Sequence, residues 1–188
     1  MSDPQQASAG QDPVLNKVVE AFSDRQLSRT VFRGQVSLIV AAEDAHEILR
    51  FLRDDAACRF NMLVDVTAVD YLGYPVDQPG RFAVVWVLRS HEHERLMLVK
   101  AYLDPSLDTS GIEADPNLEV DSVCDIWCGA EWREREVFDM FGIRFRGHPD
   151  LRRILTWRDY PAHPLRKDYP LRGRGERENY EVIDRESV

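Results

Sequence analysis

The sequence predicts an α+β fold: a single domain with a mostly antiparallel sheet of about five strands covered by helices, followed by an extended proline-rich C-terminal arm. Two patterns indicate the domain. Apolar residues recur with helical spacing in three segments, and between them they alternate or run continuously as in strands. A third observation indicates the arm, because prolines exclude regular structure near the C-terminus. These prolines are Pro149, Pro161, Pro164 and Pro170.

The N-terminal part is expected to hold two helices with a hairpin between them. Residues 1–11 are small and polar, so a flexible N-terminus is expected before the first helix. Proline at the first helical position and a capping box are the start signals of the two helices. The expected elements are a helix from Asp12 to Phe22, strands at 30–33 and 36–41 around a Gly34-Gln35 turn, and a helix that begins at Asp44 with Glu47.

Three longer strands are predicted in the middle of the chain. Apolar and polar residues alternate over 60–68, so Met62 and Val64 are expected to face the core. Residues 82–88 are apolar without interruption, which is typical of a central strand covered on both faces. Residues 96–103 are expected to form the hairpin partner of this central strand.

The last predicted helix carries an acidic residue on its apolar side. Apolar residues recur from Val123 to Phe141, and Gly142 ends the pattern as a left-handed cap would. Glu134 continues the apolar stripe, so we expect this carboxylate to be buried against a fixed donor, in this chain or in a partner. Arg135 and Asp139 are four residues apart and are expected to pair on the helix surface.

Charge is distributed unevenly along the 188 residues. The formal net charge is −9, yet nine arginines and lysines oppose only three aspartates between Ile143 and Gly175. Such asymmetry favours an electrostatically steered contact with another protein. Nucleic acid is a poor alternative, because the acidic remainder would repel phosphates. The length fits one domain at 12–146 with an arm at 147–188.

Several kinds of site are disfavoured by the sequence. No apolar run approaches the roughly 20 residues of a membrane-spanning helix, and the first residues lack the pattern of a signal or transit peptide. Cys58, Cys124 and Cys128 form no CxxC motif and are interpreted as buried free thiols of a reducing compartment. His91 and His93 are interpreted as solvated turn residues rather than metal ligands. We therefore expect no catalytic, cofactor-binding or metal site in this chain.

The arm is rich in side chains that normally need a partner. Leucines and aromatic residues recur along it, whereas disordered tails are poor in them. We expect the arm to bury these side chains on a neighbouring protein, and the alternative is that it folds back over its own domain. A short edge strand at 143–146 is expected to precede it.

A continuous stretch of 22 residues resembles a known family. It reads Glu134-Arg135-Glu136-x-x-Asp139-Met140-Phe141, then six residues to His148, then three residues to Arg152-x-Ile154-Leu155. This stretch looks like the signature of the "30 kDa" subunit family, the subunit designated C, of proton-translocating NADH:quinone oxidoreductase, respiratory complex I. Residues 163–171 resemble the C-terminal segment of that family. The sequence departs from the family pattern at Arg133 and Cys128, where an aromatic residue and a proline are expected.

The resemblance implies a cofactor-free subunit in the hydrophilic arm of the complex. It would be a peripheral protein on the cytoplasmic side of the bacterial inner membrane. It would pack against the quinone-site subunit, designated D, and near the two iron–sulfur subunits designated B and I. FMN, iron–sulfur clusters and quinone would be bound by partner subunits. The whole complex would pass electrons from NADH to quinone and couple this transfer to proton translocation.

The signature residues would then be architectural and would hold the helix and the arm in register against neighbours. One alternative is the equivalent subunit of a related membrane-bound hydrogenase or another quinone-reducing complex. A stand-alone hydrolase is disfavoured, because arginines near each acid would lower its pKa. The expected structural or partner-interface residues are Glu134, Arg135, Glu136, Asp139, Gly142, His148, Pro149, Arg152, His163, Pro164, Arg166 and Asp168.

Overall fold

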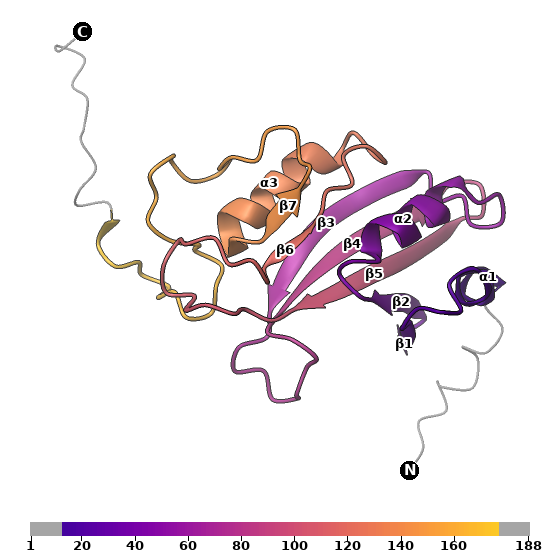
Figure 1. Ribbon diagram of the computed structural model, residues 1–188, viewed down its shortest axis with the longest axis horizontal. Coiled ribbons are helices and arrows are strands. Elements are labelled where there is room, and N and C mark those ends of the chain that lie inside the picture. The colour runs from indigo at the N-terminus through magenta and orange to yellow at the C-terminus, as the bar shows by residue number, and fades with distance from the viewer. Residues whose placement is uncertain (1–12, 177–188) are drawn as a thin grey trace, which may run out of the picture.

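The computed structural model describes residues 13–176 and shows three helices and seven strands among them (Figure 1). The expected flexible N-terminus and the last residues of the arm lie outside this range. The elements are α1 (Pro13–Ala21), β1 (Ser28–Phe32), β2 (Gln35–Val40), α2 (Ala45–Asp54), β3 (Met62–Asp70), β4 (Phe82–Ser90), β5 (Arg95–Leu103), β6 (Glu119–Asp121), α3 (Ala130–Phe141) and β7 (Arg144–Arg146).

The main sheet has five strands in the order β1-β2-β5-β4-β3. Neighbouring strands are antiparallel except β2 and β5, which are parallel because α2 and the β3–β4 hairpin separate them along the chain. The prediction of an α+β domain with a mostly antiparallel sheet of about five strands is confirmed. A second sheet, which the sequence did not predict, pairs β6 with β7 in parallel.

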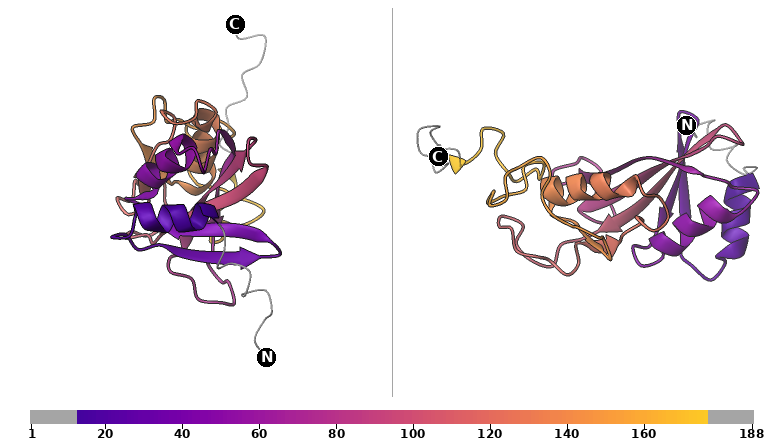
Figure 2. Two further views of the ribbon diagram at one scale, coloured as in Figure 1. Left: turned by 90° about the vertical axis from the view of Figure 1, so that its right-hand side faces the viewer. Right: turned by 90° about the horizontal axis from the view of Figure 1, so that it is seen from above.

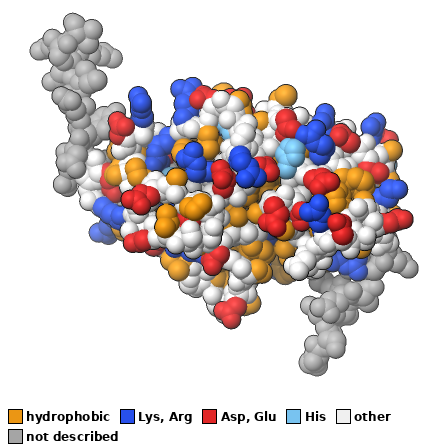
Figure 3. All heavy atoms as spheres, in the orientation of Figure 1, with side chains coloured by type: hydrophobic (Ala, Val, Ile, Leu, Met, Phe, Trp, Pro, Cys, Tyr) orange, Lys and Arg blue, Asp and Glu red, His pale blue; other side chains and the backbone are white. Residues whose placement is uncertain are grey.

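The helices lie on one side of the main sheet and enclose a single core with it (Figure 2). Trp86 and Phe82 on β4 are among the largest fully buried side chains. On the side of the molecule that carries α2 and α3, acidic and basic side chains are interspersed over the surface (Figure 3). Burial of β4 on both faces is confirmed for Phe82 to Trp86, whereas Val87 is only half-buried.

Two local predictions in the N-terminal half need correction. The β1–β2 turn is centred on Arg33 and Gly34, both of which have positive φ (51° and 79°), as a tight hairpin with right-handed twist requires. Asp44 stands at the N-terminus of α2 but makes no capping hydrogen bond. Its carboxylate instead accepts a hydrogen bond from Arg25, a residue that precedes the sheet. A tertiary ion pair therefore replaces the expected capping box.

A β-bulge corrects the predicted orientation of β3. The register with β4 moves from Leu63 directly to Asp65, so Val64 is the extra residue. The extra residue inverts the alternation, and Met62 and Val64 are exposed while Val66 and Ala68 face the core. The strict alternation read from the sequence holds only beyond the bulge.

Helix α3 is shorter than predicted. It begins at Ala130 after Gly129, and the preceding buried apolar residues Val123 and Trp127 lie on either side of a turn at residues 124–126. Cys124 and Cys128 therefore share no helix face. The prediction of buried thiols is correct for Cys58 alone, since Cys124 is half-buried and Cys128 is exposed.

The described part of the arm, residues 147–176, has turns but no α-helix or strand of its own. Within residues 13–176 no helix is both long enough and apolar enough to cross a membrane.

Candidate functional site

Asp139, near the end of α3, is the centre of the contact between this helix and the arm. Its carboxylate is fully buried and accepts hydrogen bonds from the backbone nitrogens of Ile154, Leu155 and Thr156 at 3.0, 2.7 and 2.8 Å. The Arg153 guanidinium donates to the other carboxylate oxygen at 2.7 Å, and the Thr156 hydroxyl also donates to it. One helix carboxylate thus fixes four consecutive residues of the arm.

These donors determine the protonation of Asp139. Burial by itself would raise the pKa of the carboxyl group, but the hydrogen bonds from Thr156, Arg153 and Leu155 outweigh it and lower the pKa to about 2. Asp139 is therefore a carboxylate at neutral pH. Because the folded-state pKa lies below the unfolded value, this group stabilises the fold at neutral pH, and that contribution is lost as the pH falls below about 4 towards 2.

The C-terminus of α3 is closed by the arm as well. Gly142 has a φ of 76° and caps the helix in the left-handed conformation. The buried Arg166 side chain donates to the carbonyl oxygen of Phe141 at 2.6 Å and to that of Thr109 at 2.8 Å. A guanidinium at a helix C-terminus is favourable, because the last carbonyls are unpaired and the helix dipole is negative there. A Cβ on Gly142 would lie 2.3 Å from Arg166 Nη2 and 2.6 Å from His163 Nε2, so the close approach requires glycine.

His163 is buried beside this cap as a neutral ring. Its Nδ1 lies 2.9 Å from the carbonyl oxygen of Asp139, to which it donates. Burial lowers the pKa of His163 to about 4, and the positive charges of Arg166 and Arg153 add to the effect. Protonation would therefore oppose folding.

A pH titration of stability is expected to show this histidine. An unfolded histidine takes up a proton near pH 6.5 and His163 in the folded state only near 4, so the free energy of unfolding should fall as the pH drops between these values. The slope of the unfolding free energy against pH reports how many protons the chain takes up on unfolding. In His163→Asn, whose side-chain amide can still donate to Asp139, this slope should correspond to about one proton fewer between pH 6.5 and 4. Urea unfolding at several pH values measures it; equal slopes in both proteins would contradict the assignment.

Glu134 is fully buried two turns before the cap, as predicted, and its donors belong to this chain. The Ser122 hydroxyl donates to it at 2.6 Å, the Val123 backbone nitrogen at 2.8 Å and the Cys124 thiol at 3.4 Å. Burial raises the pKa of Glu134, while these hydrogen bonds partly oppose the increase. The carboxylate therefore ties the segment that follows β6 to α3.

Cys124, Glu134 and His148 are the one group among the described residues whose spacing would suit a metal ion. Their ligand atoms lie within 4.8 Å of one another. However, His148 Nε2 donates to the carbonyl oxygen of Glu131 at 2.9 Å, and its Nδ1 accepts from the backbone nitrogen of Asp150 at 3.0 Å. Burial, together with Glu134, raises the pKa of the Cys124 thiol to about 12. A metal ion would have to break these hydrogen bonds. We therefore interpret Cys124, Glu134 and His148 as residues that stabilise the fold and not as metal ligands.

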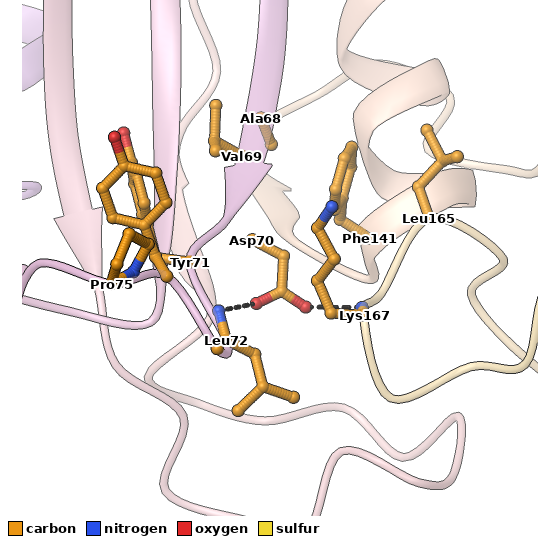
Figure 4. Close-up of a pocket in the computed structure, with 11 residues that line it drawn as sticks. Ala68, Val69, Asp70, Tyr71, Leu72, Pro75, Phe141, Leu165 and Lys167 are labelled. Atoms are coloured by element: carbon orange, nitrogen blue, oxygen red, sulfur yellow. Dashed lines mark hydrogen bonds between the residues drawn. The ribbon is translucent and has the colours of Figure 1, made fainter.

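A second anchor joins the arm to the main sheet. Arg81, immediately before β4, donates through two nitrogens to Asp70 at 3.0 and 3.1 Å and to Asp168 of the arm at 2.8 Å. Asp70 also accepts from the backbone nitrogen of Lys167 at 2.8 Å and from that of Leu72 at 2.9 Å (Figure 4). Asp168 is additionally held by the Thr109 hydroxyl. The end of β3 is thereby fixed to the arm.

Comparison with known proteins identifies the family. A sequence model of the family described as "Respiratory-chain NADH dehydrogenase, 30 Kd subunit" matches residues 38–175, which include the whole of the contact between α3 and the arm. The chain belongs to the 30 kDa subunit family of respiratory-chain NADH dehydrogenase. It is therefore a subunit of NADH:quinone oxidoreductase, complex I, and its partners are other subunits of that complex.

Relatives and solved structures agree with this membership. The chain is 46% identical over 157 residues to the NADH-quinone oxidoreductase subunit designated C of Citrifermentans bemidjiense, covering 84% of this chain and 88% of the relative. It is 44% identical over 164 residues to that of Geobacter metallireducens, covering 87% and 91%. A solved trypsin-resistant fragment of Nqo5 is 30% identical with a TM-score of 0.57, covering 73% of this chain and 99% of the fragment.

The structure brings together most of the residues expected from the 30 kDa family signature. Glu134, Asp139, Gly142, His163 and Arg166 are buried around α3, and Asp168 reaches Arg81. Arg135 does not pair with Asp139. It donates instead to the backbone carbonyls of Arg152 and Arg153 at 3.1 and 3.2 Å, because the arm occupies the carboxylate.

The remaining signature residues lie at the surface. Glu136 and Pro149 are exposed, Pro164 is half-buried, and Arg152 forms an exposed ion pair with Asp150 at 2.8 Å. His91 and His93 are also exposed, and their contacts are with separate neighbours, Met62 and Ala56. Asp70, Arg81 and Thr109 were not predicted from the sequence. The signal for Asp70 and Arg81 is a charge next to an apolar strand segment, and Thr109 has no such signal.

The arm folds back over its own domain from Arg153 to Asp168. This was the less favoured of the two predicted courses. The expectation that the arm lies on a neighbouring protein is wrong for these residues. They contact a carboxylate and carbonyl oxygens of α3, Asp70 at the end of β3, and Arg81 just before β4. Several of its leucines nonetheless stay exposed: Leu155, Leu165 and Leu171.

Proposed function

We propose that this chain is a cofactor-free structural subunit of the hydrophilic arm of NADH:quinone oxidoreductase. In this proposal it packs against the quinone-site subunit and near the iron–sulfur subunits, as a peripheral protein on the cytoplasmic side of the bacterial inner membrane. FMN, iron–sulfur clusters and quinone are bound by partner subunits. The division into a domain at 12–146 and an arm at 147–188 belongs to the same proposal.

One observation carries the structural role: the two buried acids of the signature, Asp139 and Glu134, are used in internal hydrogen bonds. Both oxygens of Asp139 are occupied by the arm, and both oxygens of Glu134 by the segment at Ser122–Cys124. A general acid or base must instead reach a substrate. This arrangement also argues against the stand-alone hydrolase.

The exposed members of the signature supply a surface for a partner. Glu136, Pro149 and Arg152 are exposed around α3, and the nearby Trp132 is 67% exposed although tryptophan is a costly residue to leave in water. Among the described residues Glu136 forms no ion pair. Exposed tryptophan and arginine are enriched where protein interfaces derive most of their binding energy.

The proposal is tested by recovering tagged chain gently from its native membranes and identifying the proteins that accompany it. Recovery of the quinone-site, iron–sulfur and nucleotide-binding subunits with NADH:quinone activity is expected. Recovery of a hydrogenase without nucleotide-binding subunits would instead favour the alternative complex. Recovery of the chain without any other subunit would contradict both the proposed complex and the alternative complex.

A double variant tests the exposed surface at α3. Trp132→Ser with Glu136→Lys should reduce recovery of the partner subunits at least tenfold, because it removes the aromatic anchor and reverses a charge. Folding should change little, within about 0.5 kcal/mol, since both side chains are exposed. Glu20→Lys on α1 is the matched control and should leave recovery unchanged. Full recovery of partners with the double variant would exclude this surface.

The second candidate is the equivalent subunit of another respiratory complex. The fold also occurs in the structure of a membrane-bound sulfane sulfur reductase, an archaeal respiratory membrane complex, with a TM-score of 0.65 and 23% identity, covering 92% of both chains. This likeness concerns the fold alone. The composition of the recovered complex distinguishes the two candidates.

A further inference from the structure

The main sheet has one face that no described helix covers. In the right-hand view of Figure 2 the helices lie on one side of the strands, and the opposite side is free of them. Antiparallel sheets with one solvated face normally carry polar side chains there. Here the second face carries polar or charged residues at Ser37, Asp65, Thr67 and Arg89, but six large aliphatic residues lie among them. These residues are Ile39 on β2, Val69 on β3, Val85 and Val87 on β4, and Leu96 and Leu98 on β5.

The apolar surface continues into the loop after β3. Val69 is 36% and Leu96 45% exposed on the sheet, and Leu72 and Tyr74 of the loop are 46% and 56% exposed. A hollow of about 520 Å³ connects Val69 with this loop and with Leu165 of the arm (Figure 4). Large apolar side chains that are exposed on a sheet face and its adjoining loop are typical of sites of protein contact.

One positive charge lies in the middle of this face. Lys100 on β5 stands between Ile39 and Val85 in the sheet register. Its ammonium group donates to the Tyr71 hydroxyl at 3.0 Å and lies 5.6 Å from the ring centres of Tyr71 and Tyr102. It has no carboxylate within ion-pair distance among residues 13–176. Burial would lower the pKa of Lys100, but Tyr71 and Tyr102 outweigh this and raise it, so the group is charged.

We propose that this helix-free face is a docking surface for a segment of a partner subunit that is mainly apolar and carries one carboxylate, which pairs with Lys100. The inference rests on the proposed function, since it needs a larger assembly. A partner that covers the face removes Lys100 from water, and an ammonium buried without a counter-charge is strongly unfavourable. The occupant must therefore bring an anionic group to this position.

A second copy of this chain does not meet that requirement. The acidic residue on the same face is Asp65, and its carboxylate is already paired with Arg133 at 3.2 Å. Asp70 at the end of β3 and Asp168 of the adjoining arm are engaged by Arg81. Two copies meeting through this face would therefore leave both lysines without a counter-charge.

Chemical labelling of the purified complex tests the proposal directly. A carbodiimide should join the Lys100 amine to an Asp or Glu of another subunit, identified by mass spectrometry. Acetylation of Lys100 should be at least tenfold slower in the complex than in the free chain. Equal acetylation rates would overturn the docking surface. Protection without a cross-link would overturn the carboxylate pairing, and a cross-link to another copy of this chain would overturn the choice of partner.

Variants add a second measurement. Lys100→Glu and Leu96→Glu should each reduce recovery of partner subunits at least tenfold, whereas Lys100→Arg should retain it. Leu96→Glu is expected to fold normally, because Leu96 is exposed and a glutamate there would face Arg89 on the neighbouring strand. The control is Lys17→Glu on the exposed side of α1, with no expected loss. Wild-type recovery by both glutamate variants would refute the inference. If no partner subunits are recovered with the wild-type chain, the result contradicts the proposed function and not the docking surface.

Discussion

Replacing Asp139 by alanine is expected to destabilise the chain by about 4 kcal/mol or more. The change leaves the backbone N–H groups of Ile154, Leu155 and Thr156 and the Arg153 guanidinium without their shared acceptor, which is fully buried. The arm should then detach from α3. Urea unfolding of the purified chain measures the loss, and hydrogen exchange at residues 154–156 reports the detachment.

Two further variants separate this effect from a general loss of charge. Asp150→Ala removes a carboxylate of the arm that has only an exposed ion pair with Arg152, and should change stability by less than about 0.5 kcal/mol. Asp139→Asn keeps one acceptor oxygen but turns an NH₂ group towards donors, so it should be nearly as damaging as alanine. The acid-induced loss of stability below about pH 4 should be weaker in both Asp139 variants. A loss of under about 1 kcal/mol in Asp139→Ala would show that the arm is held by other contacts.

Replacing Glu134 by alanine is expected to cost about 3 kcal/mol. The Ser122 hydroxyl and the Val123 backbone nitrogen would lose a buried acceptor, and a cavity would remain beneath α3. The Ser122–Cys124 segment is the first part of the connection from β6 to α3, so its release should also impair assembly with partner subunits. Unfolding measurements and recovery of partners from membranes report the two effects.

The matched control for this prediction lies on the same helix. Glu136→Ala removes an exposed carboxylate two residues away, and should leave the free energy of unfolding within about 0.5 kcal/mol of wild type. If Glu134→Ala were as stable as Glu136→Ala, the internal hydrogen bonds of Glu134 would contribute nothing. If the Glu134→Ala chain were stable but failed to assemble, Glu134 would act in partner contact and not in folding.

The fold was predictable where local pattern controls it. The hydrophobic periods located α1, α2 and most of the strands, because each period matches one geometry of the backbone. The errors arose where one residue or one tertiary contact changes the outcome. The extra residue at Val64 inverted the exposure of Met62, and Arg25 drew Asp44 away from its expected cap. The start of α3 was placed too early, because buried residues on either side of a turn can have the spacing of a helix.

The candidate site divides in the same way. The sequence by itself determined that Glu134 would be buried and hydrogen-bonded, that Gly142 would cap the helix, and which family the signature resembles. Only the tertiary structure decided that Asp139 binds the arm rather than Arg135, and that Arg166 caps α3 and Arg81 holds Asp168. Periodicity encodes which side of an element is apolar. It does not encode which donor, tens of residues away, will meet a given carboxylate, since that depends on how the packed elements bring distant segments together.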